Sequence, residues 1–192
     1  DDARFCGNLA MLWVGQDEPE AARSLALRSL QLDPRQAVTW RTLGGLSAAG
    51  GDFDSARGEL QRSLSQVESG FTYSCLAETL FIQGDLEGAE AQFRKAEALA
   101  SRWEFPDPRI SGVMGDHLVA RNFGALLEQM KRPREALEQY RRVLDSLPGE
   151  AWTHERLASL LARERSKDFW DAVGAWIEPS LEPSLDEKAL EP

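Results

Sequence analysis

Small and large apolar residues recur along this chain at a fixed spacing. In four segments a small residue is followed twelve positions later by an alanine, and seven positions after that by a third residue that is mostly small. A large apolar residue precedes the first small residue each time, and another follows four positions after the central alanine, except at Ala26. The four sets are Ala10, Ala22 and Ser29; Gly44, Ala56 and Ser63; Ala77, Ala89 and Ala96; and Gly124, Ala136 and Val143.

This spacing is typical of pairs of antiparallel helices. Small residues let two helix backbones approach closely, and the large apolar residues then fill the space beside them. Each pair leaves an apolar face that only a neighbouring pair covers, so stability comes from stacking. The pattern predicts an all-α chain with helices at 3–16, 19–32, 37–49, 53–66, 71–83, 86–100, 114–130 and 133–146.

A fifth pair is predicted after Glu150, with a different spacing. Leu157, Ala158 and Leu161 repeat the pattern of the first helix of a pair. The distance from Ala158 to Ala172 is fourteen residues instead of twelve. We therefore expect an enlarged turn and a pair that caps the array.

The distances between the central alanines point to a known repeat. They are 34, 33 and 47 residues, and the first two match the period of tetratricopeptide repeats. With the segments 32–34, 39–44 and 83–89, the chain resembles this family over roughly residues 3–177. The resemblance implies a right-handed superhelical solenoid of antiparallel helix pairs. About five repeats are expected, near 3–36, 37–69, 70–100, 114–149 and 150–177.

Two segments fall outside the repeat. Residues 101–113 form an insert that contains Pro106 and Pro108, which interrupt regular helix. We expect either an ordered loop or a helix extension there. Residues 178–192 are acidic and rich in proline, which predicts a linker or a disordered tail.

Charge and composition exclude several classes of partner. The formal net charge of −10 opposes phosphate binding, so nucleic acid and anionic membranes are poor partners. No apolar run reaches the length of a membrane-spanning helix, which predicts no membrane insertion. Two cysteines are too few for a disulfide scaffold, so we expect free thiols and a cytoplasmic protein.

The sequence contains no recognisable catalytic, cofactor-binding or metal-binding motif. His117 and His154 lie far apart, and neither has a partner at metal-ligand spacing. Cys6 and Cys75 belong to first helices two repeats apart, too far for a disulfide or a zinc pair. We therefore predict no catalytic residues, no cofactor and no metal, and interpret the chain as a non-catalytic binding scaffold.

The resemblance also implies where a partner binds. In this family the first helix of each repeat lines a concave groove, and counting from the small residue places this chain's groove positions. The arginines are expected to hold carboxylates, and the aromatic residues to accept apolar side chains. The predicted partner-binding residues are Arg41, Phe71, Glu78, Phe81, Arg121, Glu128 and Trp152. Further positions expected in the groove are Arg4, Met11, Val14, Gly45, Ala48, Ile82, Leu118, Ala125, Glu155 and Ser159.

Three alternatives bear on the kind of partner. The clamp of lysine, asparagine and arginine that binds chaperone C-termini in one subgroup is absent, which excludes that ligand. Residues 110–144 look like repeat regions attached to family-2 glycosyltransferases of bacteria, which predicts an accessory domain of an enzyme. Trp170 and Trp176 on the last pair offer apolar contact for self-association into a homo-oligomer.

Overall fold

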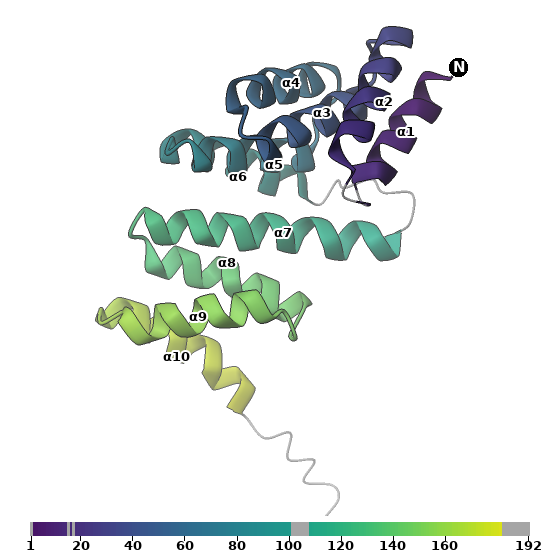
Figure 1. Cartoon of the computed structure of the whole chain (residues 1–192). Helices are drawn as coiled ribbons and strands as arrows, with labels where there is room; N and C mark the ends of the chain where they lie inside the picture. The colour runs from purple at the N-terminus through teal and green to yellow at the C-terminus, as the bar shows by residue number, and fades with distance from the viewer. Residues whose placement is uncertain (1, 15, 17, 101–107, 182–192) are drawn as a thin grey trace, which may run out of the picture.

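The chain is a stack of helices in the computed structural model (Figure 1). The structure describes residues 2–14, 16, 18–100 and 108–181, and the side chains of these residues except 13, 100, 108–116 and 177–181. Within these ranges all regular structure is α-helical, which confirms the predicted all-α solenoid. The helices are α1 (Ala3–Val14), α2 (Pro19–Leu32), α3 (Ala37–Ala49), α4 (Phe53–Gln66), α5 (Gly70–Ile82), α6 (Leu86–Ala100), α7 (Pro108–Gln129), α8 (Pro133–Ser146), α9 (Ala151–Arg163) and α10 (Lys167–Leu181).

Close contact between a small and a large residue holds the second and fourth pairs together. A Cβ atom added at Gly44 of α3 would lie only 2.6 Å from Leu60 Cγ of α4. The equivalent contact in the fourth pair joins Gly124 to Tyr140 Cε1, again at 2.6 Å. The central alanines of all four pairs are fully buried. The predicted close approach of the backbones is therefore the contact that forms each hairpin.

A buried serine ties the end of the second helix to the start of the first in two pairs. The Ser29 hydroxyl donates to the backbone oxygen of Ala3 at 2.7 Å, and the Ser63 hydroxyl donates to that of Ala37 at 2.8 Å. Both serines occupy the last small position of the repeated pattern. A small residue is needed there for packing, and serine adds a hydrogen bond between the helices.

The buried side chains form two separate clusters. The larger cluster extends from Leu60 on α4 to Val173 on α10, and it includes the stacked rings of Phe93 and Phe123, whose centroids are 5.4 Å apart. The smaller cluster joins α1, α2 and α3. The residue that replaces the large apolar side chain in the first pair, Ala26, lies in this smaller cluster. The first hairpin is consequently attached by fewer and smaller side chains.

The last two helices pack differently from the four earlier pairs. Among the described residues, α9 and α10 both lie against α8, and they are not closely aligned with each other as the earlier partners are. Ala158 is exposed and Ala172 only partly buried, whereas the matching residues of the other pairs are buried. The two additional residues between these alanines displace them, so the close small-residue contact does not form.

The long helix α7 includes part of the predicted insert. It begins at Pro108, a position in the first turn where proline is tolerated because its backbone donor is not needed. Residues 108–113 are thus helical, an extension of the repeat's first helix. Residues 101–107 of the insert lie outside the described residues. The predicted tail overlaps the end of α10, and its remainder, 182–192, also lies outside them.

Candidate functional site

A hollow of about 290 Å³ lies on the first helices of the first three repeats. Its walls come from α1, α3 and α5, which lie next to one another along the stack. Most of its lining is aliphatic or aromatic, and Arg41 is the one charged residue in it. The lining residues are Met11, Val14, Arg41, Thr42, Gly45, Leu46, Ala49, Phe71 and Cys75.

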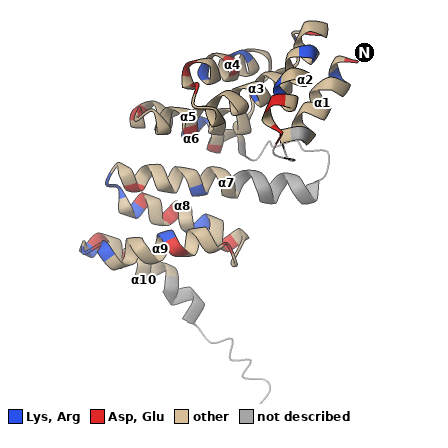
Figure 2. Cartoon of the chain, viewed as in Figure 1, with Lys and Arg blue, Asp and Glu red and all other residues tan. Residues whose placement is uncertain are grey.

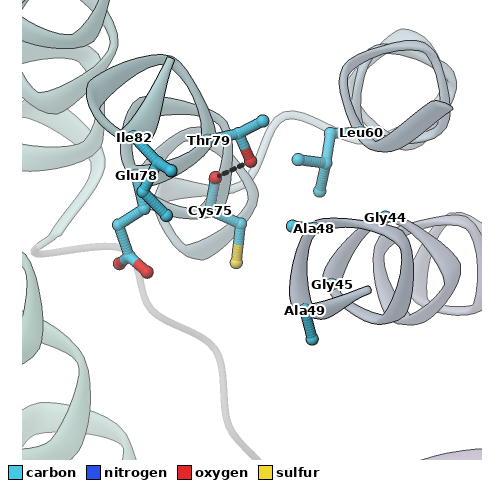
Figure 3. A pocket seen from close by; sticks show the side chains of 9 residues that line it. All are labelled: Gly44, Gly45, Ala48, Ala49, Leu60, Cys75, Glu78, Thr79 and Ile82. Atoms are coloured by element: carbon cyan, nitrogen blue, oxygen red, sulfur yellow. Dashed lines mark hydrogen bonds between the residues drawn. The ribbon is translucent and has the colours of Figure 1, made fainter. Parts of the chain in front are cut away.

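A second hollow of about 250 Å³ continues the first between α3 and α5 (Figure 3). Gly45, Ala49 and Cys75 line both, so the two form one depression, which we call the groove. Gly45 lies in its middle, and a Cβ atom added there would meet nothing within 4 Å. The remaining residues of the second hollow are Gly44, Ala48, Leu60, Glu78, Thr79 and Ile82.

The helices that form the groove carry few charges. Helices α1, α3 and α5 have one charged residue each, namely Arg4, Arg41 and Glu78. Their partners α2, α4 and α6 have three, four and five, counting Asp, Glu, Lys and Arg. Figure 2 shows α3 and α5 almost free of acidic and basic residues, in contrast to α4, α8 and α9. Arg41 and Glu78 are therefore the two charged residues that line the groove.

Arg41 lies over the ring of Phe71, with its guanidinium carbon 4.8 Å from the ring centroid. Burial lowers the pKa of this guanidinium from its ordinary value, and the nearby Cys75 acts in the opposite direction. Arginine nevertheless stays protonated in proteins. In the part of the chain that the structure describes, no carboxylate forms an ion pair with Arg41. The face of the Phe71 ring therefore stabilises the cation on one side.

Glu78 lies seven residues beyond Phe71 on the same helix and is oriented by neutral donors. Its Oε1 atom accepts from the Ser74 hydroxyl at 3.2 Å and from Asn122 Nδ2 on α7 at 2.7 Å. Two neutral hydrogen bonds position a carboxylate without cancelling its charge. Glu78 thus adds a fixed negative charge to the groove at the end opposite Arg41.

Cys75 lies between these two charges. Figure 3 shows its side chain pointing from α5 toward the space that separates this helix from α3. Burial raises the pKa of the thiol to about 12, and the Glu78 carboxylate adds to the rise. The thiol is therefore protonated at neutral pH, and a nucleophilic role is disfavoured because the thiolate is the reactive form. Both cysteines of the chain are free.

Arg121 and Trp152 form a second cluster on later repeats. The Arg121 guanidinium lies 5.2 Å from the centre of the Trp152 ring, and its Nη1 atom lies 3.8 Å from Glu150 Oε1. Its Nε atom donates to Asn122 Oδ1 at 3.2 Å. Arg121 thus has a carboxylate, an amide and an aromatic partner within the chain. Arg121 therefore differs from Arg41, which forms no ion pair within the described residues.

Two of the predicted binding residues have packing roles. Glu128 is only 6% exposed, and its carboxylate accepts from the Tyr140 hydroxyl and from Arg156. Arg163 also forms an ion pair with it. Phe81 is partly buried against the larger hydrophobic cluster. The structure therefore brings Arg41, Phe71 and Glu78 together in one groove, and the other four predicted residues are not among those that line it.

Several groove residues were not among those predicted to bind a partner. Ala49 and Cys75 line both hollows, and Thr79 lines the second. Their positions follow the helical spacing, since Ala49 is four residues after Gly45 and Cys75 is four after Phe71. Extending the predicted face by one turn on each helix would have included them.

The described residues contain no group of three or more histidine, cysteine, aspartate or glutamate residues placed to hold a metal ion. No described helix is both long and apolar enough to cross a membrane. The groove itself holds one thiol, one carboxylate and one guanidinium, and the thiol is protonated.

Comparison with a family model agrees with this geometry. Residues 72–100, which comprise most of α5 and all of α6, match the tetratricopeptide repeat. This match covers one helix pair of the chain. The resemblance predicted from the spacing of alanines is thereby confirmed.

Solved structures share this helical-repeat fold over most of the chain. PilF of Pseudomonas aeruginosa superposes with a TM-score of 0.72 at 18% identity, covering 88% of this chain and 74% of PilF. MamA gives 0.64 at 17% identity, with 90% and 92% of the two chains covered. YrrB, described as a tetratricopeptide-repeat protein with an unusual peptide-binding site, gives 0.62 at 22% identity, with 98% and 93% covered. No curated protein sequence matches this chain.

Proposed function

We propose that this protein is a non-catalytic scaffold that binds a segment of another protein in the groove on α1, α3 and α5. The observation that carries the proposal is the continuity of the two hollows across the first helices of three successive repeats. A ligand lying there contacts several repeats at once, and extended surfaces of this kind are how helical solenoids bind partners. The fold that the chain shares with YrrB supports this assignment.

Exposed apolar side chains along the groove favour a protein ligand. Met11 is 39% exposed, Val14 46% and Ile82 64%. Their burial under a ligand contributes free energy in proportion to the apolar area removed from water. A short peptide segment with apolar side chains is a suitable occupant of a groove of this size.

A bulky side chain introduced at Gly45, a residue that lines the groove, tests the proposal. Gly45→Trp places an indole where a Cβ atom has no neighbour within 4 Å, so the helix tolerates it while the groove is blocked. Gly58→Trp, on the exposed surface of α4, is the matched control, because a Cβ atom there also has no neighbour within 4 Å. Peptides are selected from a phage-displayed library of random peptides against the intact chain, and their affinities are measured by fluorescence anisotropy.

We expect the selected peptides to lose at least about tenfold in affinity for Gly45→Trp, a loss of about 1.4 kcal/mol or more in binding free energy. Their affinity for Gly58→Trp should be unchanged. Circular dichroism should show both variants to be as helical as the unmodified chain. Equal binding of the peptides to both variants, or failure of the library to yield any binder, would contradict the proposal.

A further inference from the structure

We infer that the groove binds its ligand in one direction, with an acidic side chain against Arg41, an apolar side chain over Gly45, and no acidic side chain at the Glu78 end. This inference rests on the proposed function and specifies the ligand chemistry of the same site. It depends on three observations, which concern the pairing of Arg41, the spacing of the two charges and the absence of a cation beside Glu78.

The first observation is that Arg41 has no anionic partner among the described residues. Its guanidinium carbon is 4.8 Å from the centre of the Phe71 ring, which stabilises the cation from one face. Within the described residues it has no ion pair, although it lines the most apolar part of the groove. A cation in apolar surroundings is costly unless an anion accompanies it. A ligand carboxylate can supply that anion and form charged hydrogen bonds with the guanidinium.

The contrast with Arg121 shows that this condition is specific to Arg41. Arg121 also belongs to a first helix and also lies over an aromatic ring, that of Trp152. However, it is accompanied by Glu150, with Nη1 3.8 Å from Oε1. A carboxylate of the chain therefore pairs with the Arg121 cation, whereas no described carboxylate pairs with the Arg41 cation. A ligand carboxylate gains more at Arg41, because it competes there with no residue of the described chain.

The second observation is the distance between the charges. Glu78 follows Phe71 by seven residues on α5. At a rise of 1.5 Å per residue, this places the two ends of the groove roughly 10 Å apart along the helix. That distance equals about three residues of an extended ligand or about seven residues of a helical one. Gly45, Ala49 and Cys75 line the part of the groove that joins the two hollows.

The third observation is that Glu78 has no neighbouring cation among the described residues. Both hydrogen bonds to its Oε1 atom come from neutral groups, Ser74 and Asn122. Among the described residues no lysine or arginine pairs with it. A ligand carboxylate at this end would face a like charge, so an acidic ligand bound in the reverse direction is disfavoured. Arg41 attracts the acidic residue and Glu78 excludes it from the opposite end.

The inference is tested with peptides selected from the same phage-displayed library of random peptides. We expect enrichment of peptides that carry one acidic residue to one side of an apolar residue, with neutral or basic residues on the other side. The affinity of a labelled selected peptide is then measured for the intact chain and for Arg41→Gln, Glu78→Gln and Arg121→Gln. Melting temperature and helicity are recorded for each variant, and Arg41→Lys tests whether a cation alone restores binding in part.

Arg41→Gln should weaken binding roughly tenfold or more, the usual effect of losing a charged hydrogen bond. Replacing the peptide's acidic residue by glutamine should cause the same loss, and the two losses should not add because they remove one interaction. Glu78→Gln should restore affinity for a peptide that is acidic at both ends. Arg121→Gln should cause a much smaller loss than Arg41→Gln, because Arg121 is linked to the groove only through Asn122, which donates to Glu78.

Two results would overturn the inference while leaving the proposed function intact. One is a set of peptides that Gly45→Trp blocks but that shows no preference for acidic residues. The other is additive losses from Arg41→Gln and from the altered peptide. If the selected peptides bind Gly45→Trp as well as the intact chain, the groove is not the binding site and both proposals fail.

Discussion

At the scale of single residues, contacts between one small and one large side chain determine how closely the second, third and fourth hairpins pack. Gly44 opposes Leu60, and Gly124 opposes Tyr140. In the third repeat, Ala77 and Phe93 occupy the same two positions and both are fully buried. Because protein interiors are packed as densely as crystals, an additional methyl group at such a contact forces the neighbouring helix to move.

Gly44→Ala should therefore lower the free energy of unfolding by about 1–3 kcal/mol. The new Cβ atom would lie 2.6 Å from Leu60 Cγ and 3.3 Å from the backbone oxygen of Ala56. Gly58→Ala is the control, because its Cβ atom has open space and alanine favours helix by up to about 1 kcal/mol over glycine. Urea denaturation measures both. Equal stability of the two variants would show that a methyl group fits at position 44 without forcing the neighbouring helix to move.

Glu128 is a second residue whose environment determines its role. It lies on α7 and joins this helix to α8 through Tyr140 and to α9 through Arg156 and Arg163. Glu128→Gln keeps the shape but removes the charge. We expect a loss of about 1–3 kcal/mol in the free energy of unfolding, as for a buried charged group that loses its partners. Peptide affinity should not change, and a selective loss of affinity would instead support the partner-binding role predicted from sequence.

At the scale of helices and turns, the loops within the hairpins use one repeated conformation. Gly51 and Gly84 have φ angles of 81° and 83°, and Lys131 has a φ angle of 59°. All three lie five residues before the central alanine of their pair. Glycine adopts this left-handed conformation without strain, whereas a residue with a Cβ atom does not. The fourth hairpin therefore contains a strained residue where the second and third contain glycine.

Lys131→Gly should raise the free energy of unfolding by about 1 kcal/mol, because it removes this strain at some cost in the entropy of the unfolded chain. Lys131→Ala keeps the Cβ atom and should give no such gain. Thermal denaturation of both variants distinguishes an effect of backbone strain from an effect of the lysine side chain. A stability gain in Lys131→Ala equal to that in Lys131→Gly would mean that the lysine side chain, and not the backbone, causes the difference.

At the scale of the whole molecule, stability is expected to vary along the stack. The larger hydrophobic cluster connects α4 to α10 without interruption, whereas α1 and α2 are attached through the small cluster that contains Ala10, Ala26, Leu30 and Leu43. In a linear array each repeat depends on its neighbours. The first hairpin has one neighbour among the described repeats, and most of its buried side chains are small, Leu30 being the large one among the described residues.

Native-state hydrogen exchange should therefore show faster exchange of amides in α1 and α2 than in α5 to α8. Opening of a terminal unit with few buried contacts needs less free energy than global unfolding. Ala26→Leu, which restores the large apolar side chain of the other repeats, tests whether this cluster can be extended. Uniform protection from α1 to α8 would indicate that the array unfolds as a single unit.

The sequence alone determined the fold and most helix ends. Residues such as Ala22, Ala56 and Ala89 recur because each hairpin needs the same close contact between two neighbouring helices, and such a local requirement leaves a periodic trace in the sequence. Counting along these helices also placed Met11, Arg41 and Gly45 on the face that proves to be hollowed. A residue's place on a helix depends only on its distance along that helix.

Only the tertiary structure decided which charges on that face are left unpaired. Arg41 and Arg121 have similar positions in the repeated pattern. Of the two, only Arg121 forms an ion pair with a described carboxylate, that of Glu150. Glu128 was expected on the binding face, but it is enclosed by residues of α8 and α9. The spacing likewise predicted a fifth pair of helices, and α9 and α10 are both present, but Ala158 is exposed and does not form the contact of the earlier pairs. Ion pairs and contacts between hairpins depend on how successive pairs rotate against each other, and that rotation leaves no periodic signal in a single sequence.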